Sequence, residues 1–425
     1  MMKQMKLIYL LLMSIVVSVT FHSCNLFDNE TEDKKTANEY IYETFKEWYL
    51  WYNQIPDIDP NGIATQAELI DSIKSPVDRW SFSGSLTEIN KLFEGGSYTG
   101  FGAGFMLDAD GKIKIPYVYD QSPLGKAGIK RGWQVLSVNG YTPDDLENVN
   151  NALANDQTVA FEFLDRDQIN HSITATKAEF EMNTVLYSTV FDYSTTKIGY
   201  VVFNSFVSTS SAELDTVFTR FKKQNVNELI VDLRYNGGGL NDIAYQLIAE
   251  IGGSKVKNQV ISKLEHNDKH SDKNTSKIST YKGASLELNR VFFITTSNTA
   301  SASELVINSM SPFMEVNLTG SNTHGKPVGM YIFKVEALDL AILPISFKNT
   351  NQLGYGDYYS GLSVNTNEAD DLTHNWGDPE ESMLKATLNS VLGAVTFNQP
   401  SLKSAKADLQ KPLEYQGIYQ LIGAY

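Results

Sequence analysis

Short apolar strands alternate with helices after residue 181, and this pattern constrains the fold more than any other feature of the sequence. Predicted strands at 198–203, 228–233 and 290–296 are each followed by a predicted helix. A strand that returns through a crossover helix becomes a parallel neighbour in the same sheet. The pattern therefore predicts an α/β domain with a mixed sheet over residues 181–400. The polar, Lys- and His-rich stretch 265–277 is interpreted as a solvated loop, and the tail 401–425 receives no prediction.

Residues 96–180 have a different pattern, in which short alternating runs are separated by Gly, Pro and Asp-Gly turns. Such runs are typical of half-buried strands. The segment predicts a small β-rich module with two short helices. Its predicted strands are 112–118, 134–138, 158–164 and 169–175, and its predicted helices are 123–127 and 144–153.

Residues 36–95 predict a helical N-terminal domain. The segment 36–54 places several aromatic residues at helical spacing, and this apolar face is expected to pack into a core. Pro56 and Pro60 should end that helix, and Ser75-Pro76 should interrupt the helical pattern of 65–94.

The first 23 residues have the pattern of an export signal. Lys3 and Lys6 precede the apolar run 7–21, which is too short to span a bilayer comfortably. Cys24 follows at once and is the only cysteine of the chain, so an exported form has no disulfide to make. We expect Cys24 to be lipidated, which makes the protein a membrane-anchored lipoprotein on the periplasmic or cell-surface face. The alternative is an ordinary signal peptide in which Cys24 is incidental. Residues 24–35 are polar and predict a flexible tether.

Charge and composition exclude some classes of function. The formal net charge is −15, and it becomes −17 once Lys3 and Lys6 leave with the signal. A chain this acidic should not attract nucleic acid through its overall field. The histidines show no metal-ligand spacing, so neither a metal nor a cofactor is expected.

Ser301 is the first candidate for chemistry. It lies in Thr-Ala-Ser-Ala-Ser-Glu (299–304), between a predicted strand and a predicted helix. A serine on such a turn is exposed at the sheet edge, and the free N–H groups of the helix N-terminus favour a developing negative charge. The same residues are also compatible with a simple helix cap followed by a first-turn acid.

Lys326 is the second candidate, in the glycine-rich segment 320–329 after the predicted strand 315–318. If its amine is buried beside Ser301, it would lose its charge and could act as a base. An exposed lysine would be an ordinary turn residue. His324 is two residues away, and a Ser–His pair oriented by Asp378 or Glu304 is an alternative.

Gly237, Gly238 and Gly239 follow the strand 228–233 and allow a close backbone approach. An N–H group of this turn could pair with that of Ala302 to bind an oxyanion. A phosphate-binding loop is excluded, because no Gly-Lys-Ser/Thr closes the run.

Together these segments resemble the tail-specific, or C-terminal processing, peptidases of family S41. The resemblance covers about residues 96–400 and rests on four motifs in the family's order: a stretch at 122–140 similar to bacterial PDZ domains, Asp-Leu-Arg-Tyr-Asn-Gly-Gly-Gly at 232–239, the serine motif at 299–304, and Gly-Lys at 325–326. It implies that Ser301 is the nucleophile, that Lys326 is the base, and that Gly237, Gly238 and Ala302 form the oxyanion hole. Residues 48–52 and 78–82 also resemble the N-terminal region of a lipoprotein subgroup from Bacteroidetes-type bacteria.

Two positions depart from the family pattern. Many relatives have a glutamine four residues after the lysine, where this chain has Met330, and some have an aspartate where this chain has Pro312. Thr323, Ser303 and Glu304 are the candidates to orient the lysine instead. These departures motivate an alternative function, that of a non-catalytic peptide-binding lipoprotein with a decayed site.

Gly100, Phe101 and Gly102 resemble the carboxylate-binding loop of a PDZ domain. Their backbone N–H groups could hold a peptide C-terminus, with Phe101 and Phe105 lining an adjacent pocket and the peptide added along a sheet edge. Alternatively, the glycines only make a turn.

The sequence thus predicts an exported multidomain α/β serine endopeptidase with a Ser301–Lys326 dyad. Its expected partners are protein or peptide substrates recognised by their C-termini, and its oligomeric state is not predicted. An esterase-like hydrolase acting through the same residues is a further alternative.

Overall fold

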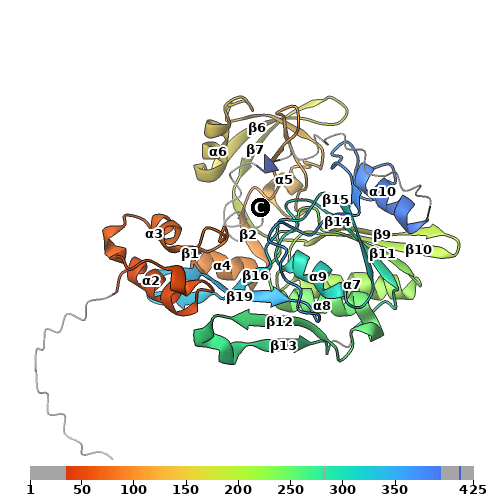
Figure 1. The fold of residues 1–425 in the computed structure, drawn as a ribbon. Coiled ribbons are helices and arrows are strands. Elements are labelled where there is room, and N and C mark those ends of the chain that lie inside the picture. The colour runs from red at the N-terminus through yellow and green to blue at the C-terminus, as the bar shows by residue number, and fades with distance from the viewer. Residues whose placement is uncertain (1–34, 281–282, 394–410, 413–425) are drawn as a thin grey trace, which may run out of the picture. The chain divides into compact units, whose positions relative to one another are not determined.

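The computed structural model describes residues 35–280, 283–393 and 411–412 (Figure 1). The export signal, Cys24, nearly all of the tether and most of the tail lie outside the described residues. Among the described helices, none combines the length and apolarity that a membrane crossing requires.

A six-stranded mixed sheet forms the centre of the α/β region, in the order β20-β15-β14-β11-β10-β9. β9 pairs antiparallel with β10, and the other neighbours are parallel. The predicted mixed sheet is therefore confirmed. Its strands are β9 (Val185–Tyr193), β10 (Thr196–Phe203), β11 (Glu228–Asp232), β14 (Arg290–Thr295), β15 (Glu315–Gly320) and β20 (Thr366–Asn367).

Helices cover both faces of this sheet (Figure 1). α7 (Ser210–Lys223), α8 (Asn241–Gly252) and α9 (Ala302–Met310) bury their apolar faces on one side, and α10 (Ser382–Val391) covers the other. Strand residues alternate between the two cores because successive side chains of a strand point to opposite faces. In β11, for example, Val231 joins the first core and Ile230 the second. The serine turn thus lies at the end of a strand that is buried on both faces.

The β-rich module has its own hydrophobic core, in which the ring of Phe161 contacts those of Phe101 and Phe105. Strands 134–138 and 158–164 are confirmed, whereas the predicted strand 112–118 is only two residues long. Pro116 explains the difference, since proline has no N–H for the ladder. The elements are β3 (Met106–Leu107), β4 (Ile113–Lys114), α5 (Pro123–Lys126), β5 (Gln134–Val138), α6 (Leu146–Asn155), β6 (Thr158–Leu164) and β7 (Asn170–Thr176), with β2 (Ser97–Gly100) and β8 (Ala178–Glu181) pairing at the base. β21 (Lys411–Pro412) pairs antiparallel with β3 at the sheet edge.

The N-terminal region is helical, as predicted, and contains α2 (Ala37–Trp48), α3 (Gln66–Ile73) and α4 (Leu86–Phe93). Phe45 and Tyr49 of the aromatic face are fully buried, which confirms that this face is core. The segment also contributes a strand, β1 (Phe82–Ser85), that pairs with β18 (Leu340–Leu343), which in turn pairs with β17 (Phe333–Val335). Residues 82–85 therefore join the N-terminal region to the C-terminal half.

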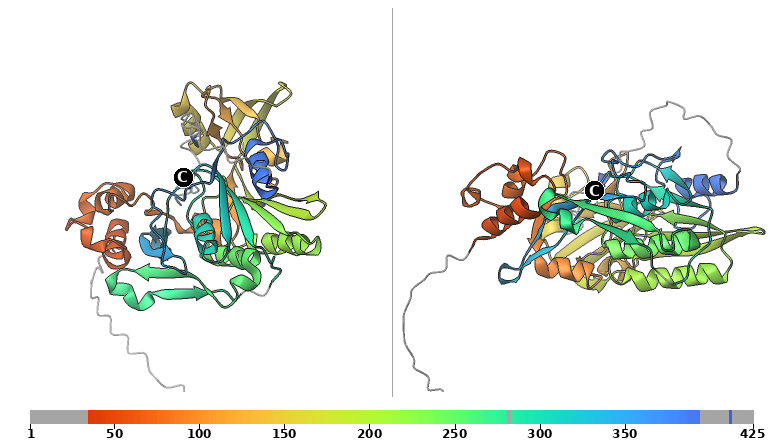
Figure 2. Two further views of the ribbon diagram at one scale, coloured as in Figure 1. Left: turned by 45° about the vertical axis from the view of Figure 1, so that its right-hand side comes forward. Right: turned by 60° about the horizontal axis from the view of Figure 1, so that its bottom comes forward.

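The stretch 265–277, interpreted as a solvated loop, is mostly exposed, but its two ends are strands and not loop. It belongs to a hairpin of β12 (Val260–His266) and β13 (Thr275–Ile278), and β12 pairs with β19 (Ile345–Thr350), whose other neighbour is β16 (Val328–Met330). The hairpin extends toward α2 (Figure 2), where Asn267 donates to the carbonyls of Glu47 and Tyr49. Its polar composition reflects these contacts with other segments, which single-sequence periodicity does not reveal.

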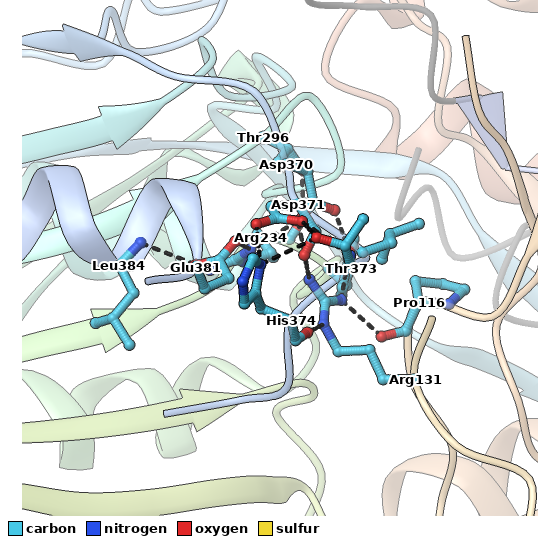
Figure 3. Close-up of polar contacts among 12 residues, drawn as sticks. Pro116, Arg131, Arg234, Thr296, Asp370, Asp371, Thr373, His374, Glu381 and Leu384 are labelled. Atoms are coloured by element: carbon cyan, nitrogen blue, oxygen red, sulfur yellow. Dashed lines mark hydrogen bonds and ion pairs between the residues drawn. The ribbon is translucent and has the colours of Figure 1, made fainter. Parts of the chain in front are cut away.

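A buried ion cluster connects the β-rich module to the central sheet (Figure 3). Arg234 contacts Asp232, Asp370 and Glu381, each at 2.7 Å, and Arg131 of the module contacts Asp370 at 3.0 Å. Burial alone would raise the pKa of Asp370, but the charges of Arg131 and Arg234 hold it at about 2. Because this pKa is depressed in the folded state, the stabilisation is present above the unfolded value of about 3.9 and is lost as the pH falls toward 2.

We predict that Asp370→Asn lowers the free energy of unfolding by roughly 3–5 kcal/mol, since it leaves Arg131 buried without its carboxylate partner. Glu380→Gln is the matched control, because the Glu380–Lys385 pair is exposed to solvent and should contribute little to stability. Guanidinium denaturation followed by circular dichroism measures both. Equal effects of the two substitutions would contradict the role given to Asp370.

Candidate active site

Ser301 occupies the tight turn between β14 and α9. Its backbone φ is 56° and its ψ is −114°, a conformation that residues other than glycine rarely adopt. Such strain costs on the order of 1–3 kcal/mol and persists only where the surroundings enforce it. The N–H of Ser301 donates to Glu304 Oε2 at 3.0 Å, which fixes the turn to the first turn of α9. The serine is thus held at the N-terminus of a helix, as the sequence predicts.

Lys326 lies on the loop between β15 and β16 and is only 3% exposed. Gly325 makes this loop possible: its φ is +90°, and a Cβ there would lie 2.4 Å from the carbonyl oxygen of Tyr359. Lys326 and Ser301 line the same cavity, which has a volume of about 550 Å³. The cavity also contacts Gly237, Gly239 and apolar residues from several strands and loops, among them Leu240, Leu264, Met330, Leu343 and Phe347.

The environment of Lys326 favours a neutral amine. Burial lowers the pKa of Lys326 to about 8, against the opposing charges of Asp78 and Glu304. A lysine with this pKa is partly deprotonated near neutral pH, so it can accept a proton. The lysine is therefore not an ordinary solvated turn residue.

His324 is neutral and its ring contacts Trp80 and Ser297. Burial, together with the charges of Arg79 and Lys326, lowers its pKa to about 4, so the ring is neutral. Trp80 Nε1 donates to His324 Nε2 at 3.0 Å, and His324 Nδ1 faces the carbonyl of Ser297 at 3.3 Å. Since Nε2 accepts from Trp80, the ring proton belongs on Nδ1. Both ring nitrogens are thus engaged in contacts other than one with Ser301.

The glycine turn packs directly against the serine. A Cβ on Gly238 would lie 2.8 Å from Ser301 Cβ and 2.9 Å from Ala302 N, so only glycine allows this approach. Asn236 holds the turn: its Oδ1 accepts from Gly238 N at 2.9 Å, and its carbonyl accepts from Ser303 Oγ. The Gly238 N–H, predicted as an oxyanion donor, is therefore already engaged with Asn236. Gly237 and Ala302 are the other two predicted donors, and their role stays a prediction.

Two buried carboxylates lie close to Ser301 and Lys326. Glu304 is fully buried and bonds both the serine turn and the lysine loop. It was one of three candidates for orienting the lysine, and its position three residues after Ser301 was the available signal. Asp78 is 2% exposed and comes from the N-terminal region. Its only sequence signal was the family-like run at 78–82.

The predicted docking loop differs from expectation in its side chains. Phe101 and Phe105 are each 3% exposed and pack in the module core, so they do not line an open pocket. Gly102 has a φ of +78°, and its carbonyl accepts from Tyr119 N at 2.9 Å. Gly100 pairs with Ala178 in the β2–β8 ladder. The aromatic rings of the loop therefore serve packing, and the backbone of Gly100 and the carbonyl of Gly102 already have partners.

Comparison with known proteins finds matches to one peptidase family in two regions of the chain. The sequence profile of peptidase family S41 matches residues 197–353, and that of the peptidase S41 N-terminal domain matches residues 36–82. A protein of Staphylococcus saprophyticus named as a CtpA-like serine protease is 25% identical over 310 residues, which cover 72% of this chain and 60% of that protein. The carboxy-terminal processing protease CtpA of Bacillus subtilis is 25% identical over 335 residues, covering 76% of this chain and 69% of that protein.

The fold has a counterpart among solved structures. A crystal structure from Bacteroides fragilis assigned to the S41 proteases superposes with a TM-score of 0.71 at 23% identity, covering 85% of this chain and 99% of that one. The matched region spans about three fifths of the length of the staphylococcal relatives. Residues 36–82 and 197–353 are thus the parts of the chain that match peptidase family S41, with the N-terminal domain followed by the peptidase domain.

Proposed function

We propose that this protein is a serine endopeptidase of the C-terminal processing type that hydrolyses peptide bonds through a Ser301–Lys326 dyad. One observation carries the proposal: a strained serine at a helix N-terminus and a buried lysine with a pKa of about 8 line one cavity. Neither feature is needed to fold an α/β domain. Depressing a lysine pKa from 10.5 to about 8 costs roughly 3 kcal/mol, and a merely structural residue would not require this.

In the proposed mechanism, neutral Lys326 takes the proton of Ser301 Oγ as the oxygen attacks the scissile carbonyl. The N–H groups of Ala302 and Gly237 stabilise the oxyanion of the tetrahedral intermediate. The ammonium of Lys326 then returns the proton to the leaving amine, and an acyl-enzyme remains on Ser301. A water molecule, deprotonated by Lys326, hydrolyses this ester and restores the serine.

The alternative of a decayed, peptide-binding protein rests on Met330, which lines the cavity where a hydrogen-bonding side chain would be expected. A protein that only binds peptides would need neither the backbone strain at Ser301 nor the burial of Lys326. Covalent labelling of Ser301 therefore separates the two functions.

We predict that Ser301→Ala and Lys326→Ala each lower the rate of cleavage of an unfolded protein substrate by at least about 100-fold, because each removes a reacting group. His324→Ala should retain most of the activity, since its ring contacts Trp80 and Ser297. Fluorophosphonate labelling, with circular dichroism as the folding control, should follow the same order. An active Lys326→Ala together with an inactive His324→Ala would reverse the assignment of the base.

The same assay gives a pH dependence. The base must be deprotonated to act, so the wild-type rate should rise with pH through a midpoint near 8, the pKa of Lys326. A flat profile between about pH 6 and 9 would contradict a neutral lysine base, provided that chemistry limits the rate.

The β-rich module is proposed to act as a PDZ-like docking site for the C-termini of substrates. A peptide would add antiparallel to β3, next to the loop that contains Gly100 and Gly102. The pairing of β21 with β3 supports this, because the chain's own backbone at 411–412 already occupies that edge in the expected direction. A substrate peptide would then take the place of β21.

We predict that a chain ending at residue 393 binds a peptide with a free, apolar C-terminus more tightly than the full chain, because β21 no longer competes for β3. Amidating the peptide should weaken binding by up to a few kcal/mol, as expected for the loss of charge-assisted hydrogen bonds. Isothermal titration calorimetry on Ser301→Ala forms measures both effects. Equal affinity for free and amidated peptides would remove the docking role.

Lipidation of Cys24 is proposed to anchor the protein. We predict that Cys24→Ser moves the protein from the membrane fraction to the soluble fraction and removes incorporation of a labelled fatty acid, because the lipidated cysteine is the anchor identified in the sequence. Membrane association of both forms without lipid label would indicate an ordinary signal peptide.

A further inference from the structure

One carboxylate connects the turn that carries the proposed nucleophile to the loop that carries the proposed base. Glu304 Oε2 accepts from Ser301 N at 3.0 Å and from Lys326 N at 2.8 Å. Glu304 Oε1 accepts from Gly325 N at 2.7 Å and from Thr323 Oγ1 at 2.6 Å. Each oxygen thus has two donors, and three of the four donors belong to the lysine loop.

This arrangement exceeds what a helix cap requires. Thr65 and Glu68 form a capping box at the start of α3, in which Glu68 Oε2 accepts from Thr65 N at 3.1 Å while its side chain remains in solvent. Glu304 has the same position relative to α9, yet it is 0% exposed. Burying a charged carboxylate is costly unless its lone pairs are satisfied. The donors that satisfy them here come from the loop of Lys326.

A carboxylate is the side chain that fits four donors. It offers lone pairs on both oxygens, whereas a glutamine amide would place its own N–H groups against two of the four donors. Burial raises the pKa of Glu304, and the bonds from Thr323, Lys326, Gly325 and Ser301 oppose that shift. The charged groups that act on Lys326 are Asp78 and Glu304, and both favour its ammonium form. Buried Tyr358 also faces Glu304 and carries no charge at neutral pH, since burial holds its pKa well above 10.

We propose that Glu304 is the positioning residue of the Ser301–Lys326 pair, since its carboxylate fixes the lysine loop against the serine turn. Thr323 extends the connection, because its Oγ1 donates to Glu304 and accepts from Leu362 N at 2.7 Å. This inference rests on the proposed peptidase function. It assigns to Glu304 the task that Met330, four residues beyond the lysine, cannot perform with a weakly accepting thioether.

The test compares Glu304→Gln with Glu68→Gln in the full chain. We expect Glu304→Gln to lower both cleavage and fluorophosphonate labelling by about 100-fold, as a displacement of about 1 Å between reacting groups does. Glu68→Gln, which changes an exposed cap far along the sequence, should leave both rates unchanged. A folded Glu304→Gln with wild-type rates would overturn the proposal.

The titration of Lys326 gives a readout that a purely structural role would not move. Competitive acetylation of the lysine by acetic anhydride, followed by mass spectrometry across a pH series, measures its midpoint without any need for turnover. Removing the negative charge of Glu304 should lower this midpoint, since that charge favours the ammonium. An unchanged midpoint would count against the proposal. If Ser301→Ala cleaved as well as the wild type, the proposed function would fall while the acetylation midpoint still decided the role of Glu304.

A second pair of variants covers the case in which Glu304→Gln does not fold. Thr323→Val removes one donor and keeps the shape and the charge of the site, so we expect a several-fold loss of labelling rate. Thr323→Ser keeps the hydroxyl and should lie much closer to the wild type. Equal rates for Thr323→Val, Thr323→Ser and the wild type would overturn the proposal independently of the glutamate variant.

Discussion

The placement of the glycine turn depends on the burial of one guanidinium group, that of Arg234. This residue is 1% exposed, and three carboxylates surround it: Asp232 at the end of β11, Asp370 from the loop after β20, and Glu381 at the start of α10. An unpaired guanidinium in this position would cost several kcal/mol, so the three segments must meet there for the fold to form. Gly237 of the glycine turn lies three residues after Arg234. The position of this turn therefore follows from the position of the buried guanidinium.

The same cluster ties the β-rich module to the site. Arg131 of the module donates to Tyr235 Oη at 2.8 Å, and Tyr235 in turn bonds Asp370. The ring of Trp376 lies 3.9 Å from the guanidinium of Arg131 and excludes water from one face of it. Residues of the module and of the glycine turn therefore share one set of buried charges, and the cost of separating them is electrostatic as well as hydrophobic.

Much of the fold could be predicted from the sequence because local patterns determine it. The strand 228–233 has an apolar centre, Leu229 to Val231, because helices cover both of its faces, and this signal is strong. The β12–β13 hairpin was not predicted, because its polar residues contact α2 and the cavity, and neither contact has a periodic signature. The strand at 112–118 was too long in the prediction, because the effect of Pro116 on the ladder was not weighed.

The site also combines residues that local motifs reveal with contacts that only the folded chain reveals. Ser301, Lys326 and the glycine turn lie in short motifs that the sequence makes visible, and the structure brings Ser301, Lys326 and Gly237 to one cavity. The bond between Gly238 N and Asn236 could not be anticipated, because it depends on the rotamer of one asparagine. The role of Asp78 could not be read from the sequence either, since 248 residues separate it from the lysine whose charge it affects.

The N-terminal region is consequently part of the site and not only a support for it. Trp80 donates to His324, Ser81 Oγ accepts from Ile345 N at 2.9 Å, and Asp78 binds the backbone N–H groups of Trp80 and Ser81. These contacts place residues 78–81 against His324 and Ile345, which lie before and after Lys326 in the sequence. One of the two carboxylates that oppose the lowering of the pKa of Lys326, Asp78, therefore comes from a region far away in the sequence. The pKa of about 8 at Lys326 is thus a property of the assembled chain, because it depends on burial, and the lysine loop alone would leave the amine in water with its ordinary pKa.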